Sequence, residues 1–140
     1  MAATTVPESA CDYTNDDASA AITNVAQAVA ILQAVKMAAD AVEDGSAQYE
    51  DPHVARWSPA IGVATRKVGL VRDTMIGTAG APSVDWFTSL ALLEALDAAL
   101  WHTSSRYDTS QRMDADSVKD LCDVIIIELA KLKQGLAECR

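Results

Sequence analysis

Hydrophobic residues recur at intervals of three and four positions along most of this sequence, and this spacing constrains the fold more than any other feature. Such a repeat places apolar side chains on one face of an α-helix and leaves the opposite face polar. The clearest case is the alanine-rich segment 17–43, which contains neither glycine nor proline. Its apolar positions are Ile22, Val25, Val29, Leu32, Val35, Ala39 and Val42. The spacing predicts a long amphipathic helix that must pack against other helices.

Three further segments carry the same helical pattern. A second helix is expected over 58–77, because Ser58 can cap its first turn and Pro59 is tolerated there. A third helix is expected over 83–103, and a fourth begins near Asp114 or Asp116. The fourth carries apolar residues at alternating spacings of four and three: Val118, Cys122, Ile125, Leu129, Leu132 and Leu136. We identify no segment with the two-residue alternation typical of a β-strand.

Four amphipathic helices joined by short connections predict an all-α four-helix bundle, most simply with an up-down-up-down antiparallel topology. A chain of 140 residues, of which 50% are hydrophobic, suits one domain with one core. We therefore expect a single helical-bundle domain over 15–140, preceded by a flexible acidic segment over 1–14. Gly62 and Gly69 lie on one face of the second helix, and close approach of another backbone is the simplest reason for them.

The net charge of −9 disfavours nucleic acid and anionic membranes as partners. The basic stretch 56–72 is a local exception, and we expect its cations to pair with acidic neighbours within the fold. The N-terminus lacks the pattern of a secretory signal, and no apolar run is expected to span a membrane, which favours a cytoplasmic protein. The three cysteines form no metal motif. We place Cys122 in the core. The expected topology brings Cys11 and Cys139 to the same end of the bundle, and we leave open whether they form a disulfide.

Two pairs of acids one helical turn apart are candidate metal ligands. Glu94 and Asp97 lie in "EALD" on the third helix, and Asp120 and Asp123 lie in "DLCD" on the fourth. Carboxylates at this spacing project together, and oxygen ligands suit Mg²⁺ or Mn²⁺. Both spacings resemble the acidic pairs that all-α nucleotide pyrophosphohydrolases carry on bundle helices, which implies a metal-dependent hydrolase. The first helix, however, lacks the cluster of glutamates of that family.

The other interpretation is that the acids of the third helix face water. At about 100° per residue, one narrow stripe of that helix comprises Leu90, Glu94, Asp97 and Trp101. A turn centred near residue 80 would set Glu94 level with Arg66 of the antiparallel second helix, since the rise per residue is equal. We therefore expect Glu94 to form an ion pair with Arg66 or Lys67, with Asp97 more exposed.

Two surfaces carry more apolar residues than an isolated bundle requires. Val124 and Ile127 project from the fourth helix opposite its core positions, and Leu90 and Trp101 lie on the polar stripe of the third. Apolar side chains on otherwise polar faces are typical of protein interfaces. Either the fourth helix is central in the bundle, or its outer face is an interface, and we favour the interface because a simple bundle leaves each helix one outward face.

The sequence therefore predicts a small acidic intracellular protein that acts by protein–protein binding without cofactor or chemistry of its own. A homodimer is the expected form, and an adaptor or inhibitor that binds a basic protein target through its acidic surface would leave the same traces. The alternative is the hydrolase that uses Mg²⁺ or Mn²⁺.

Overall fold

The four expected helices are all present in the computed structural model, which describes residues 15–43, 54–76, 84–104 and 113–138. Helix α1 spans Asn15–Glu43, and a short 3₁₀ helix, η1, spans Val54–Trp57 directly before α2. The remaining elements are α2 (Ser58–Ile76), α3 (Phe87–Ser104) and α4 (Ala115–Glu138). These elements confirm the all-α four-helix fold, and no strand occurs within the described ranges.

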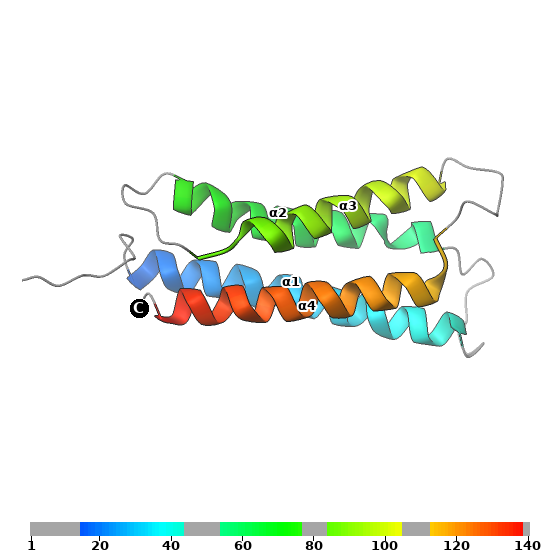
Figure 1. Cartoon of the computed structure of the whole chain (residues 1–140), viewed down its shortest axis with the longest axis horizontal. Coiled ribbons are helices and arrows are strands. Elements are labelled where there is room, and N and C mark those ends of the chain that lie inside the picture. The colour runs from blue at the N-terminus through cyan, green and yellow to red at the C-terminus, as the bar shows by residue number, and fades with distance from the viewer. Residues whose placement is uncertain (1–14, 44–53, 77–83, 105–112, 139–140) are drawn as a thin grey trace, which may run out of the picture.

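Consecutive helices run in opposite directions, so that α1 and α3 point one way while α2 and α4 return (Figure 1). Helix α1 packs extensively against both α4 and α2, and α2 packs against α3. The contact between α3 and α4 is the smallest of these four, although the two helices are consecutive. Each helix therefore has two main neighbours, and the face turned away from both lies on the outside of the bundle.

The core consists of the apolar positions that the helices turn toward each other. In α4 the buried residues include every member of the expected seam, from Val118 to Leu136. The corresponding residues of α1 are smaller: Ala18, Ala21, Val25, Ala28, Leu32, Val35 and Ala39. Ile22, Val29 and Val42, which we expected on this seam, are only partly buried at its edge. Full burial of each valine or leucine contributes about 1.5–3 kcal/mol before entropy is subtracted.

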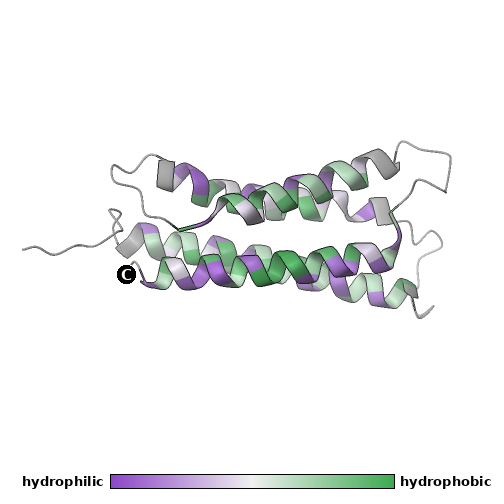
Figure 2. Ribbon diagram, in the orientation of Figure 1, coloured by the Kyte–Doolittle hydropathy of each residue, from purple (hydrophilic) through white to green (hydrophobic). Residues whose placement is uncertain are grey.

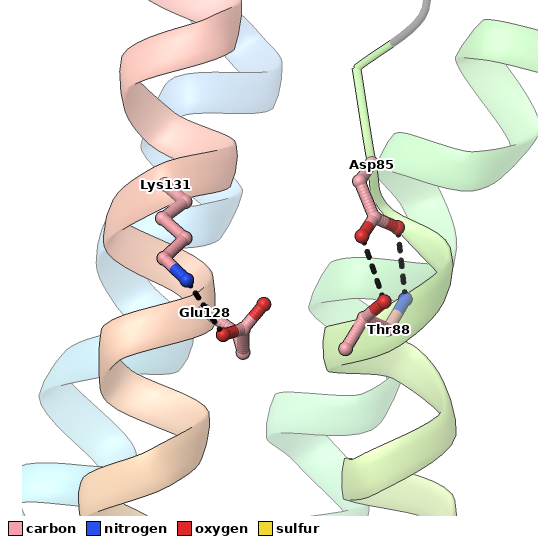
Figure 3. Close-up of polar contacts among 4 residues, drawn as sticks. All are labelled: Asp85, Thr88, Glu128 and Lys131. Atoms are coloured by element: carbon pink, nitrogen blue, oxygen red, sulfur yellow. Dashed lines mark hydrogen bonds and ion pairs between the residues drawn. The ribbon is translucent and has the colours of Figure 1, made fainter.

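Two helices begin at aspartate caps. The Asp85 carboxylate accepts hydrogen bonds from the backbone N–H of Thr88 at 3.0 Å and from its hydroxyl at 2.7 Å (Figure 3). At the start of α4, the Ser117 backbone N–H donates to Asp114 at 2.7 Å. These bonds stabilise the charged carboxylates and lower the pKa of both aspartates. They also satisfy N–H groups that lack partners within the first turn of each helix.

Helix α1 differs from the sequence expectation in one respect. Within the described residues, the segment Asp17–Val42 is long and apolar enough to cross a membrane, judged by length and composition alone. We had expected no segment to meet that criterion. The core helix of a bundle meets it too, and here the buried face of α1 packs against α2 and α4. The alanine content of α1 accounts for its high hydropathy, because alanine counts as apolar but buries little surface.

Candidate functional site

The acids that could hold a metal are directed to different helices. The Ser58 hydroxyl of α2 donates a hydrogen bond to Asp97 at 2.9 Å. On α4, Asp123 forms an ion pair with Lys36 of α1, and its hydrogen bond and charge raise the pKa of Lys36. Glu94 and Asp120 are both exposed. Among the described residues, no three His, Cys, Asp or Glu side chains gather in a way that could hold a metal ion.

Helices α1 and α4 are joined by a second ion pair. Lys119 of α4 contacts Asp40 of α1 at 2.9 Å, one turn along each helix from the pair between Asp123 and Lys36. Because the helices are antiparallel, a step toward the N-terminus of α4 is a step toward the C-terminus of α1. Asp123 therefore belongs to a row of ion pairs between α4 and α1. These ion pairs explain why Asp123 faces α1, and no bound metal is needed for that explanation.

The expected ion pair between Glu94 and Arg66 is not formed, and neither Arg66 nor Lys67 has an ion pair within the described part of the chain. The bond between Ser58 and Asp97 fixes the register of α2 against α3. Arg66 follows Ser58 by eight residues, so on the antiparallel α3 it is level with the residue eight positions before Asp97, which is Ser89. Glu94 is five residues from that level, so Arg66 and Glu94 are offset by about 7.5 Å along the helix axes. Glu94 and Arg66 still line the same groove, of about 620 Å³.

The register differs because α3 begins later than expected. Residues 84–86 lie outside any helix, and α3 starts at Phe87 instead of near residue 83. Figure 1 shows this non-helical stretch leading into the first turn of α3. The prediction assumed that residues at equal sequence distances before and after residue 80 lie level on the two helices, and this assumption therefore fails. As a result Asp97, which we expected to be the more exposed acid, makes the contact between the helices.

Close backbone packing does not explain the glycines of α2. A Cβ atom added at Gly62 would have the Arg66 guanidinium as its nearest neighbour, at 3.7 Å, and one at Gly69 would have the Arg72 guanidinium, at 3.8 Å. Both are ordinary van der Waals distances, and both contacts come from α2 itself. The expectation that another backbone approaches these glycines is wrong for the described residues. Arg72 pairs with its neighbour Asp73, at 3.1 Å.

Of the apolar residues expected on the surface, Leu90 is buried instead, with only 4% of its surface exposed. Helix α3 is rotated so that the stripe containing Leu90 and Asp97 faces α2, which is also why Asp97 reaches Ser58. The expectation that Leu90 belongs to an exposed interface is therefore wrong. Trp101 is 70% exposed and lines a groove of about 750 Å³ with Arg56, Pro59 and other residues of α2 and η1.

Val124 and Ile127 lie on the outside of the bundle, with 45% and 56% of their surfaces exposed. They are flanked along the helix by exposed Asp120 on one side and exposed Lys131 on the other. We refer to these four residues as the outer face of α4. Figure 2 shows that the middle of α4, where Val124 and Ile127 lie, is the most hydrophobic part of that helix.

Met37 of α1, which the sequence analysis did not single out, extends this apolar region. It is 72% exposed and lines a groove between α1 and α4 together with Ile126 and Asp123. Its position off the core seam of α1 is visible in the helical pattern, but a lone exposed methionine is too common to mark an interface. Only the tertiary structure shows that Met37 lies near Ile126 of α4.

The buried thiol of Cys122 is not suited to nucleophilic chemistry. Burial in the core raises its pKa to about 11, so the thiolate is scarce at neutral pH. Cys122 thus serves as a small core residue, as expected. The question of a disulfide between Cys11 and Cys139 lies outside the described residues.

No family model, curated protein or solved structure matches this chain. The surface chemistry of the bundle therefore has to support any functional conclusion directly.

Proposed function

We propose that this protein acts by protein–protein binding, and that it associates with a second copy of itself through the outer face of α4. The observation that carries this proposal is the exposure of Val124 and Ile127 on a helix whose opposite face already fills the core. About half of the surface of each of these residues remains in water in the single chain. That exposed part is removed from water only when a partner covers it.

A second copy is the partner that this surface fits most simply. Most soluble oligomers are symmetric homodimers, in which one patch contacts itself. The outer face of α4 carries one acid and one base, Asp120 and Lys131, so it is close to neutral although the chain has a net charge of −9. Two copies can therefore meet at this face without the repulsion that their overall charge would produce elsewhere. Met37 is exposed in the groove between α1 and α4, which it lines with Ile126.

The proposal is tested by measuring the mass of the protein in solution as a function of concentration. Light scattering should give a dimer at micromolar concentration, and Ile127→Asp should give a monomer with nearly unchanged unfolding free energy, because an exposed position loses little core burial. Leu70→Asp is the matched control. Leu70 is also an exposed apolar residue on a well-formed helix, but it lies on α2, so this variant should remain dimeric.

A monomeric wild-type protein at high micromolar concentration would remove the proposal. Equal loss of the dimer in Ile127→Asp and Leu70→Asp would place the interface elsewhere.

A further inference from the structure

Helix α4 carries two seams with the spacing of a coiled coil. The first is the buried seam from Val118 to Leu136. The second lies on the opposite side, consists of exposed residues, and alternates spacings of four and three residues: Asp120, Val124, Ile127, Lys131, Gln134 and Glu138. A seam with this spacing stays on one side of a helix over several turns, so it can contact a second helix along its length. A single bundle uses only the first.

The central part of the second seam is symmetric about its midpoint. Val124 and Ile127 lie at equal distances from the point between Ile125 and Ile126, and so do Asp120 and Lys131. When a second copy of the helix is turned end for end about that point, its Ile127 lies at the level of Val124 in the first copy, and its Lys131 lies at the level of Asp120. In an antiparallel pair of such helices, each apolar residue meets an apolar residue, and each charge meets its opposite.

The charged residues at both ends of this central part are available for such a contact. Asp120 is exposed and takes part in no ion pair among the described residues. Lys131 is exposed and contacts Glu128 at 3.1 Å within its own helix (Figure 3). An ammonium group has three donor hydrogens, so Lys131 can donate to a second carboxylate while its contact with Glu128 remains. Among the described residues, no ion pair compensates the charge of Asp120.

We infer that two copies of this chain associate through antiparallel α4 helices, about a two-fold axis between Ile125 and Ile126, with Asp120 of each facing Lys131 of the other. Val124 of each copy then lies level with Ile127 of the partner subunit. The two charge contacts lie about 8 Å on either side of the axis, since each residue is five and a half positions from it. This inference rests on the self-association proposed above and adds its register and direction.

The symmetry of this arrangement allows a charge-exchange experiment. The Asp120→Lys dimer would place lysine against lysine at both contacts, and the Lys131→Asp dimer would place aspartate against aspartate. We expect each variant alone to associate more weakly than the wild type by on the order of tenfold, because two attractions become two repulsions. In an equimolar mixture, each contact between the two variants again joins opposite charges. The mixture should therefore recover dimers of mixed composition.

The measurements are sedimentation velocity on each variant and native mass spectrometry on the mixture, in which the two variants differ in mass. Lys133→Asp is the matched control, because it makes the same charge change at an exposed position of α4 outside the second seam. It should associate like the wild type. Thermal unfolding of all three variants should follow the wild type apart from the contribution of dimerisation.

The outcomes separate the register from the self-association. If the wild type dimerises but the mixture of variants shows no recovery, the antiparallel register is wrong and the self-association remains. If Lys133→Asp weakens the dimer as much as Lys131→Asp, net charge and not a specific contact is responsible, which also overturns the register. A monomeric wild type would overturn both proposals.

Discussion

At the scale of single residues, the aspartate caps are the polar side chains with the best-defined role. Asp85 stands before α3 and accepts two hydrogen bonds from Thr88, and both bonds lower the pKa of its carboxylate. A capping residue fixes where a helix begins and satisfies N–H groups that the helix itself leaves without acceptors. Because α3 meets α2 in a defined register, the position of this first turn also determines which residues of the two helices meet.

We expect Asp85→Ala to lower the unfolding free energy by about 1 kcal/mol, the usual cost of losing a cap. Asp85→Asn should cost less, because the amide oxygen can still accept from Thr88. Since the pKa of Asp85 is lower in the folded protein than in the unfolded chain, its charge stabilises the fold above the unfolded pKa. That contribution disappears as the pH falls below about 4 through the folded pKa.

Urea unfolding of wild type and Asp85→Asn between pH 2.5 and 7 would measure this effect. The difference between the two proteins should shrink toward acid pH. A difference that stays constant over this range would show that the charge of Asp85 contributes nothing to stability.

At the scale of helices, the glycines of α2 and α4 have different surroundings. A Cβ atom at Gly62 would meet only the guanidinium of Arg66, at 3.7 Å, whereas one at Gly135 would meet the Val84 side chain at 3.2 Å. Alanine in a helix interior is favoured over glycine by up to about 1 kcal/mol. The full gain is realised only where the added methyl group displaces nothing.

We therefore expect Gly62→Ala and Gly69→Ala each to raise the unfolding free energy, by up to about 1 kcal/mol, because neither methyl group meets a packed neighbour. Gly135→Ala is the internal comparison and should gain less or nothing, because Val84 must shift. Chemical denaturation at one fixed protein concentration would decide the order of the three variants. A destabilised Gly62→Ala would indicate that this face of α2 is packed against something in the folded protein.

At the scale of the whole molecule, the distribution of acids bears on the hydrolase alternative. Asp97 contacts α2 and Asp123 contacts α1, so one acid of each pair contacts a neighbouring helix, while Glu94 and Asp120 are exposed. The ion pairs of Asp123 and Asp40 with lysines join α1 to α4, the most extensive contact in the bundle. Among the described residues, no three His, Cys, Asp or Glu side chains gather at one place where a metal ion could bind.

We accordingly expect millimolar Mg²⁺ or Mn²⁺, with or without a nucleotide, to leave the melting temperature unchanged relative to sodium chloride of equal ionic strength. A ligand that binds only the folded protein must raise that temperature. A saturable increase with Mn²⁺ that disappears in both Asp97→Asn and Asp123→Asn would restore the hydrolase interpretation.

The sequence by itself determined the helices and the buried seam of α4. The spacing of Val118, Cys122 and Ile125 depends only on the geometry of one helix, so it survives whatever the neighbours are. The same geometry placed Val124 and Ile127 opposite that seam, but only the tertiary structure showed that no other described helix covers them. Local cap chemistry likewise placed the start of α4 near Asp114 or Asp116, and the structure shows that Asp114 is the cap.

The tertiary structure alone decided how the helices are rotated and shifted against each other. Leu90 is buried, and Asp97 instead of Glu94 makes the contact to α2, because the stretch 84–86 delays the start of α3. A shift of a few residues along a helix changes the free energy of each helix by itself very little, yet it changes every contact between the two. The periodicity of one helix therefore predicts which of its faces is apolar, while the path of the connecting chain and the packing of both neighbours determine which residues meet.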